Sequence, residues 1–274
     1  MNTTPERRTA LVTGAALGLG KAIALALSEA GFSVFGTSRR PVAAPASTEF
    51  PMLTLDVRSE DSVRAAMDEL RSRARRLDVL VNNAGFRFLG AAEETSVDEA
   101  KDVFETNFFG AHRVIVAALA LMREAGAGRI VNITSLSGIN ALPFGAVYSA
   151  SKWALEAYSE SLRHEVKGLG ILVSIIEPGA IHSETREAPH VPRAIVRAYD
   201  GARRRALDVI VGGDRTGIDA TRVADCVLHV VTSRSPRLRY RVGPDAIWLP
   251  RLKLLPWSWY ERGIHWRYQL DQKK

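Results

Sequence analysis

Cysteine is almost absent from this chain. Its 274 residues include six histidines and one cysteine, Cys226. A single cysteine excludes an internal disulfide and a cysteine-rich metal centre. His112 and His164 lie in helical patterns without a partner histidine at metal-ligand spacing. We therefore expect no metal site, and we expect Cys226 to lie in the core face of a helix because apolar residues surround it.

The chain also lacks an apolar run of about eighteen residues, the length that a membrane-spanning helix needs. The segment from Met1 to Arg8 runs into Leu11-Val12-Thr13-Gly14, which is typical of a strand entering a glycine turn and not of a signal peptide. The sequence therefore predicts a cytoplasmic protein.

Acidic residues are fewer than basic ones, with 30 Asp and Glu against 37 Lys and Arg and a formal net charge of +7. Clustered cations can bind nucleic acid, but many of these arginines are scattered through predicted helices without a zinc-finger, basic-zipper or RNA-recognition signature. We expect no nucleic-acid partner. A phosphorylated cofactor, an anionic substrate or a membrane surface would use the same charge, and an arginine-rich soluble surface is the alternative without a ligand.

Strand-like and helical patterns alternate along the chain, which predicts an α/β fold. We expect a doubly wound, Rossmann-type parallel sheet with helices on both faces, forming a single domain over residues 1–274. Ser59 and Ser96 are predicted helix caps, the second with Glu99 in a capping box. The predicted strands cover residues 8–13, 32–37, 52–57, 77–82, 128–135, 170–176 and 239–242, and the predicted helices cover 18–30, 59–75, about 96–124, 146–167 and 220–232.

The regular pattern lapses after Pro178. Pro189, Pro192, Gly212 and Gly213 bracket a stretch with only a modest helical core. We interpret about residues 180–215 as a substrate lid, and a surface excursion without function is the alternative.

The tail, about residues 245–274, interleaves tryptophans with basic residues. This mixture suits a peripheral membrane contact, a wall over the substrate mouth or an oligomer contact, and the three interpretations stay open. The tryptophans are Trp248, Trp257, Trp259 and Trp266, and the cations include Arg251, Lys253, Arg262 and Arg267.

A glycine turn separates the first predicted strand from the first predicted helix. Gly14, Gly18 and Gly20 let backbone amides and a helix N-terminus approach a pyrophosphate, although their spacing departs from the common G-x-G-x-x-G pattern. A P-loop fits less well, because Ala22 replaces the magnesium-binding hydroxyl and no glycine stands five residues before Gly20. An ATPase is therefore not expected.

Tyr148 and Lys152 are four residues apart in a predicted helix and so share one face. A free tyrosine loses its proton near pH ~10, and a nearby lysine cation favours the phenolate. Tyr148 is therefore a candidate acid or base, thirteen residues after Ser135.

Six motifs occur together in one order along the chain. They are Thr13-Gly14-x-x-x-Gly18-x-Gly20, Asn82-Asn83-Ala84-Gly85, Asn107, Ser135, Tyr148-x-x-x-Lys152 and Pro178-Gly179. In order and approximate spacing they resemble the short-chain dehydrogenase/reductases, from about residue 8 to residue 183. The resemblance implies a single domain that binds NAD(H) or NADP(H) and interconverts an alcohol and a carbonyl.

A four-residue reaction site follows from this resemblance. In a reduction, Tyr148 would donate a proton to the developing alkoxide while Ser135 holds the carbonyl oxygen. Lys152 would lower the tyrosine pKa and bind the nicotinamide ribose, and Asn107 would support a water that leads from Lys152 to solvent. In isolation, Ser135 is a strand-end turn residue and Asn107 a helix-kink or capping residue.

The end of the second predicted strand bears on the choice of cofactor. Thr37-Ser38-Arg39-Arg40 offers no carboxylate for the adenosine ribose, whereas a guanidinium can bind a 2′-phosphate. We expect NADP(H) in preference to NAD(H), with Arg39 as the main contact and Ser38 as the second; a solvated loop charge is the alternative. The resemblance adds contacts from Gly14, Ala16, Leu17, Gly18, Leu19 and Gly20, from Asp56 and Val57 beside the adenine, from Asn83, Ala84 and Gly85 along the ribose, from Tyr148 and Lys152, and from Pro178, Gly179, Ile181 and Ser183, the last near the nicotinamide carboxamide.

The predicted pocket is largely apolar. We expect Phe86 and Phe144 to contact substrate together with Ser135 and Tyr148, and we favour a hydrophobic ketone, aldehyde or secondary alcohol. Arg87 leaves a 3-oxoacyl thioester as an alternative. The alternative is that the apolar residues of these segments only pack the sheet edge. They are Phe86, Phe88, Ile139, Leu142, Phe144 and Val147.

Two further expectations concern assembly and class. The resemblance implies a homodimer or homotetramer through the helices at about residues 103–121 and 146–167. A non-catalytic NADP(H)-binding sensor or scaffold is the rival from another class, but it would have little need of Ser135, Tyr148 and Lys152 together.

Overall fold

Seven parallel strands form one sheet in the order β3-β2-β1-β4-β5-β6-β9. The computed structural model describes residues 7–40, 50–182 and 188–271. The strand order reverses between β1 and β4, so the predicted doubly wound fold is confirmed. The strands are β1 (Thr9–Val12), β2 (Ser33–Ser38), β3 (Met52–Thr54), β4 (Val79–Asn82), β5 (Gly128–Ile133), β6 (Ile171–Pro178) and β9 (Arg239–Val242).

The central strands are buried on both faces, as near-continuous apolar runs require. The third strand is shorter than predicted and ends at Thr54. Leu55 still donates its amide to the Ser38 carbonyl oxygen, but the amide of Asp56 donates to Ser62 Oγ at 2.9 Å. That side chain, at the start of the next helix, therefore ends the ladder.

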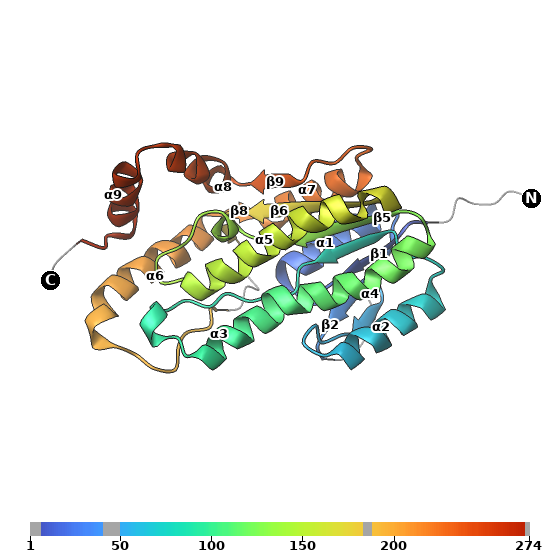
Figure 1. Cartoon of the computed structure of the whole chain (residues 1–274), viewed down its shortest axis with the longest axis horizontal. Helices are drawn as coiled ribbons and strands as arrows, with labels where there is room; N and C mark the ends of the chain where they lie inside the picture. Colours follow the sequence, from blue (N-terminus) through green and yellow to red (C-terminus); the bar gives the residue numbers. More distant parts are fainter. Residues whose placement is uncertain (1–6, 41–49, 183–187, 272–274) are drawn as a thin grey trace, which may run out of the picture.

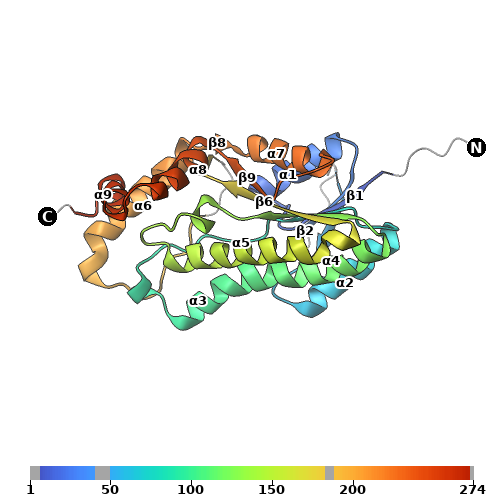
Figure 2. The ribbon, with the colours of Figure 1, turned by 45° about the horizontal axis from the view of Figure 1, so that its top comes forward.

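Helices cover both faces of the sheet (Figure 1). Helices α1 (Gly18–Glu29) and α7 (Ala220–Thr232) pack on one face, and α2 (Glu60–Arg73), α4 (Ala111–Glu124) and α5 (Ala146–Val166) pack on the other, as Figure 2 shows. Each face has its own hydrophobic core. Cys226 on α7 is only partly buried against the first core, and burial raises the pKa of its thiol to about 11.

The predicted helix over about residues 96–124 consists of three elements. Helix α3 (Val97–Phe104) continues into a π-helical turn, η2 (Glu105–Gly110), and then into α4. Both predicted caps are confirmed, since Ser59 accepts from the Ser62 amide and Ser96 forms a capping box with Glu99.

The chain after β6 is more regular than predicted. Helix α6 (Asp200–Arg215) includes Gly212 and Gly213, two of the residues expected to bracket a stretch with only a modest helical core. The tail packs against α6 through α9 (Trp257–Tyr268), and this tertiary contact outweighs the low helix propensity of glycine. The other elements are β7 (Ile181–His182), which pairs with β8 (Ile218–Asp219), helix α8 (Pro244–Trp248), and the 3₁₀ turns η1 (Ala92–Glu94), η3 (Leu136–Gly138), η4 (Lys167–Leu169), η5 (Arg197–Tyr199) and η6 (Leu249–Leu254).

Helices α6 and α9 lie at the end of the molecule toward which β6 and β9 point, far from the amino terminus (Figure 1). Within the described ranges, no helix is both long and apolar enough to cross a membrane.

Candidate active site

The predicted site residues gather at the carboxyl edge of the sheet. The glycine turn follows β1, Asn83 follows β4, Ser135 follows β5 and Gly179 follows β6. Because the strands are parallel, these four ends share one edge, and the strand order reverses there between β1 and β4, the position at which open α/β sheets bind ligands.

The glycine turn has no room for side chains at key positions. Gly14 and Gly18 adopt φ angles of +66° and +55°, which favour glycine. A Cβ on Gly20 would collide with the Gly14 carbonyl oxygen and lie 2.5 Å from Asn83 Nδ2. Helix α1 begins at Gly18 with no acidic residue in its first turn. The first turn of α1 therefore holds no carboxylate that would compete with an anion for the helix N-terminus.

Thr13 joins the turns after β1 and β4. Its hydroxyl accepts from the amides of Asn83 and Ala84, both at 3.0 Å. The side chain of Asn83 donates back to the Thr13 carbonyl oxygen at 3.0 Å. The Asn83 amide thus holds the glycine turn in place, and its contact with a cofactor ribose stays a prediction.

Tyr148 and Lys152 lie in the first two turns of α5, and both side chains are buried. Lys152 Nζ donates to the Ile133 carbonyl oxygen at 3.0 Å, at the end of β5 and two residues before Ser135. Burial lowers the pKa of Lys152 to about 8, while the carboxyl of Glu156 acts in the opposite direction. Ser135 is less buried, and its Oγ accepts from the Ser137 amide at 3.1 Å.

Asn107 lies in the π-helical turn and is buried. Its Oδ1 accepts from the Phe86 amide at 3.0 Å, and its Nδ2 donates to the Phe86 carbonyl oxygen at 3.0 Å and to Ser151 Oγ at 3.1 Å. A Cβ on Gly85 would lie 2.9 Å from Asn107 Oδ1 and 3.6 Å from Lys152 Nζ. The structure therefore places both Asn107 and Lys152 next to Gly85.

Three segments predicted to form the substrate pocket meet in the structure. The rings of Phe86 and His190 lie 4.5 Å apart, and those of Phe144 and Tyr199 lie 6.3 Å apart. The Gly90 amide donates to the Phe144 carbonyl oxygen at 2.7 Å. The segments after Gly85, before Tyr148 and after residue 187 are thereby brought together.

Arg87 is already paired in this pocket region. Its Nη1 lies 2.7 Å from Asp214 Oδ2 on α6, and the two side chains are 14% and 16% exposed. The alternative of a 3-oxoacyl thioester substrate depended on the charge of Arg87, and this ion pair neutralises that charge.

The remaining predicted cofactor contacts lie at the end of β2 and after β6. Ser38 ends β2, and the exposed Arg39 follows it at the carboxyl edge. A Cβ on Gly179 would collide with the Asp245 carboxylate, which accepts from the Ala180 amide at 2.7 Å. Ile181 is buried in β7, whereas Ser183 lies outside the described residues.

The sequence profile of the short chain dehydrogenases matches residues 8–190. The chain belongs to the short-chain dehydrogenase family. It is therefore a dehydrogenase/reductase, and the predicted family and enzyme class are confirmed.

Known relatives of this short-chain dehydrogenase cover most of its length. A 3-ketodihydrosphingosine reductase from Bacteroides thetaiotaomicron is 36% identical over 236 residues, which span 85% of this chain and 87% of that protein. A short-chain dehydrogenase structure from Streptomyces avermitilis is 33% identical, with a TM-score of 0.84 over 95% of this chain and 99% of its own. ElxO with NADP bound is 23% identical, with a TM-score of 0.73 over 88% of this chain and 99% of its own, and shows the shared fold.

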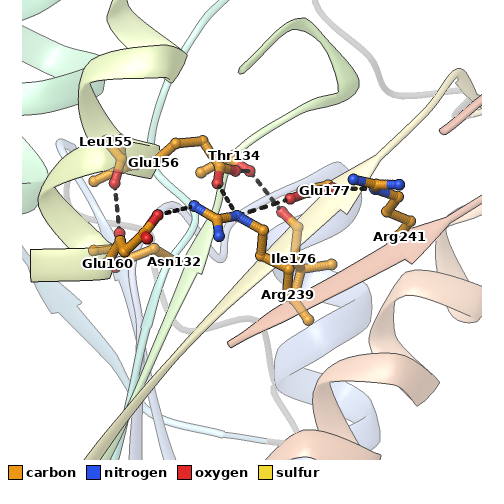
Figure 3. A network of polar contacts seen from close by, with 10 residues as sticks. Asn132, Thr134, Leu155, Glu156, Glu160, Ile176, Glu177, Arg239 and Arg241 are labelled. Carbon is orange, nitrogen blue, oxygen red and sulfur yellow. Dashed lines mark hydrogen bonds and ion pairs between the residues drawn. The ribbon is translucent and has the colours of Figure 1, made fainter. Parts of the chain in front are cut away.

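A network of buried carboxylates and partly exposed arginines adjoins the candidate site of the dehydrogenase through Thr134 and Glu156 (Figure 3). Thr134, next to Ser135, donates to Glu156 Oε1 at 2.6 Å, and Arg239 Nε donates to Glu156 Oε2 at 2.9 Å. Arg239 Nε also lies 3.4 Å from Glu177 Oε1, whose other oxygen accepts from Arg241.

This network was missed in the sequence. Glu156 is one helical turn beyond Lys152, so the series Tyr148, Lys152, Glu156 on one helix face was a detectable signal. Its partners Glu177 and Arg239 lie on neighbouring strands β6 and β9, and only the strand order brings them to α5.

Proposed function

We propose that this short-chain dehydrogenase uses NADP(H) to interconvert a hydrophobic ketone or aldehyde and the corresponding alcohol. The observation that carries the proposal is the arrangement of α5 against β5. Tyr148 and Lys152 share a buried helix face, and Lys152 is held at Ile133, two residues before Ser135. A non-catalytic binding protein has no need of this arrangement.

The residues at the carboxyl edge fit a dinucleotide. The glycine turn packs too closely against Asn83 for a side chain at Gly20, and the first turn of α1 holds no acidic residue that would repel a pyrophosphate. Arg39, exposed at the end of β2, can bind a 2′-phosphate, and the NADP bound to ElxO agrees with this choice.

The proposed reaction assigns one role to each buried polar residue. When bound, the reduced nicotinamide supplies a hydride to the carbonyl carbon. Tyr148 donates its phenolic proton to the oxygen as that oxygen gains charge, and Ser135 hydrogen-bonds the same oxygen. Lys152, held by Ile133, stabilises the resulting phenolate. Asn107 fixes the segment at Phe86 and adjoins Lys152 across Gly85, where it supports the return of a proton from solvent.

The walls of the pocket favour an apolar substrate. Phe86 and Phe144 contact other rings at the predicted mouth, and Arg87 is occupied by Asp214. A paired arginine offers little to the phosphates of an acyl thioester. The relative named 3-ketodihydrosphingosine reductase supports a long-chain, lipid-like ketone. The exposed Phe109 on η2 and Val116 on α4 support the homodimer or homotetramer that we also propose.

The test is oxidation of NADPH, followed by its absorbance, with 3-ketodihydrosphingosine, other apolar ketones, aldehydes and acetoacetyl-CoA. We expect turnover with the apolar ketones and a loss of about 10²- to 10⁴-fold in Tyr148→Phe, with NADPH binding retained. Tyr158→Phe is the matched control, because Tyr158 lies on the same helix but pairs with His112 Nδ1 at 3.0 Å. Near-normal turnover in Tyr148→Phe contradicts the proton-transfer role.

Cofactor choice has its own test. Arg39→Ala removes the proposed contact with the 2′-phosphate, and we expect the ratio of kcat/KM for NADPH to that for NADH to fall by roughly tenfold or more. Turnover with NADH serves as the internal control. An unchanged ratio would contradict the assignment of Arg39.

A further inference from the structure

All five tryptophans of this chain are exposed, with 46–84% of each residue accessible. Tryptophan is normally highly buried, and exposed groups of large apolar side chains mark interaction sites. The exposed tryptophans therefore indicate a binding surface. Four of the five lie in residues 244–271, which we call the carboxyl-terminal arm. The exposed large apolar residues of the arm are Ile247, Trp248, Leu252, Leu254, Leu255, Trp257, Trp259 and Trp266.

The arm is attached to the body of the protein by its other face. Tyr260 and Tyr268 on α9 are buried, while Trp259 and Trp266, seven residues apart on the same helix, point outward. Arg205 on α6 donates to the Gln269 carbonyl oxygen at 2.7 Å. The outward tryptophans are therefore presented on a supported helix.

The arm also adjoins the candidate site. Lys253 Nζ donates to the Ile139 carbonyl oxygen at 2.5 Å and lies 4.8 Å from the ring centroid of Trp153, the fifth exposed tryptophan. Ile139 belongs to the segment between Ser135 and Tyr148. Both the arm and the carboxyl edge of the sheet lie toward the same end of the molecule in Figure 1.

Charge selects the kind of surface that the arm fits. The arm has four lysines and arginines and three carboxylates: Asp245 accepts from the Ala180 amide, Asp271 pairs with His265, and Glu261 is the third. Arg251 lies over the ring of Trp248, at 4.5 Å from its centroid. Exposed tryptophan and leucine mixed with lysine and arginine are typical of helices that lie in a membrane interface.

We propose that the carboxyl-terminal arm docks this protein onto an anionic lipid bilayer. Trp259, Trp266 and the exposed leucines insert among the acyl chains, and the cations contact the lipid phosphates. Docking would bring the Ile139 segment close to the lipid. Delivery of a lipid-like ketone to the site rests on the proposed function, but docking itself does not.

The experiment measures binding of the full-length protein, without cofactor or substrate, to vesicles of phosphatidylcholine alone or mixed with phosphatidylglycerol. Co-sedimentation gives the bound fraction, and tryptophan emission reports burial of the exposed rings. We expect binding and a blue shift with the mixed vesicles, roughly tenfold or more weaker in Trp259→Ser/Trp266→Ser. Arg251→Gln/Arg262→Gln should weaken binding by several-fold and reduce its dependence on phosphatidylglycerol.

Val97→Ser/Leu169→Ser is the matched control, since both residues are exposed and apolar but lie outside the arm. It should bind like the wild type. Circular dichroism and NADPH binding check that each variant is folded. The proposal is overturned if the wild type binds neither vesicle, or if the tryptophan variant binds as tightly as the control. It is also overturned if the wild type ignores vesicles and the tryptophan variant converts an oligomer into monomers, because the arm then joins two copies of this chain. Binding without any reductase activity would sustain docking and remove only the proposed reaction.

Discussion

Lys152 and Glu156 lie one turn apart on α5 and are both buried, yet their surroundings differ. Lys152 Nζ has the Ile133 carbonyl oxygen as its hydrogen-bond acceptor in the described part of the chain, and burial lowers its pKa to about 8. Glu156 receives hydrogen bonds from Thr134 and Arg239. The buried cation contacts a neutral carbonyl oxygen, whereas the buried carboxylate contacts a hydroxyl and a guanidinium.

This difference concerns how the fold accommodates two buried charged groups. Isolated buried charges are unfavourable, and proteins usually pair them or shift their pKa. The dehydrogenase pairs Glu156 with Arg239 but leaves Lys152 without a directly bonded carboxylate in the described structure. A shifted pKa beside a candidate tyrosine is the pattern expected of an active site.

The largest expected effect is on stability, in Arg239→Met. This change leaves the carboxyls of Glu156 and Glu177, 6% and 0% exposed, without their shared guanidinium. We expect the free energy of unfolding to fall by about 3 kcal/mol at neutral pH, measured by urea denaturation. Arg58→Met is the control, because its ion pair with Asp102 is exposed and contributes less than about 1 kcal/mol.

The pH dependence of Arg239→Met tests the cause. Burial raises the pKa of Glu156, and loss of Arg239 should raise it further. Between the unfolded and folded pKa, the folded state binds more protons, so stability falls as pH rises and the full penalty applies above the folded pKa. The deficit of the variant should therefore shrink at mildly acidic pH, and a deficit independent of pH contradicts this explanation.

Lys152→Met should increase the free energy of unfolding, in contrast to Arg239→Met. Lowering a lysine pKa from 10.5 to about 8 corresponds to a penalty of about 3 kcal/mol, and loss of the bond to Ile133 offsets about 1 kcal/mol of it. We expect the variant, without cofactor, to be about 2 kcal/mol more stable than the wild type at neutral pH, and inactive.

The advantage of Lys152→Met should depend on pH. Between about 8 and 10.5, unfolded wild-type protein holds more protons at this lysine than folded protein does, so wild-type stability rises with pH. The advantage is therefore complete below about 8 and lost by 10.5. Thermal melts across this range measure it. A less stable variant would mean that Lys152 supports the fold.

The sequence predicted the elements that local patterns determine and missed features that depend on tertiary contacts. Apolar runs and their glycine or serine boundaries predicted the strands and helices up to β6, because local periodicity determines them. The three elements between Ser96 and Glu124 were merged, since a π-helical turn keeps the helical pattern. Gly212 and Gly213 were interpreted as bracketing an irregular stretch, although both lie within α6, which packs against α9.

For the site, the order of the motifs along the chain identified the candidate residues. Contacts between residues far apart in the sequence could not be predicted. Tyr148, Lys152 and Ser135 could be grouped because motif order marks them, and the structure brings Lys152 to the strand that precedes Ser135. The partners of Arg87 and Glu156 could not be predicted, because Asp214 and Arg239 are 127 and 83 residues away and reach them only through the packed fold.

The smallest expected effect concerns the influence of the Glu156 carboxyl on the pKa of Lys152. The carboxyl of Glu156 raises the pKa of Lys152 against the larger lowering by burial. Glu156→Gln keeps the shape and the bond from Thr134 but removes the charge, so the pKa of Lys152 should fall below about 8. A protonated Lys152 favours proton transfer from Tyr148, and the alkaline limb of kcat/KM for reduction should move by a few tenths of a pH unit toward acid. Glu160→Gln, which binds the same Arg239 at the exposed end of the network, should leave the limb in place. If both variants leave it in place, Glu156 acts only in stability, and the separation between the two buried charges is complete.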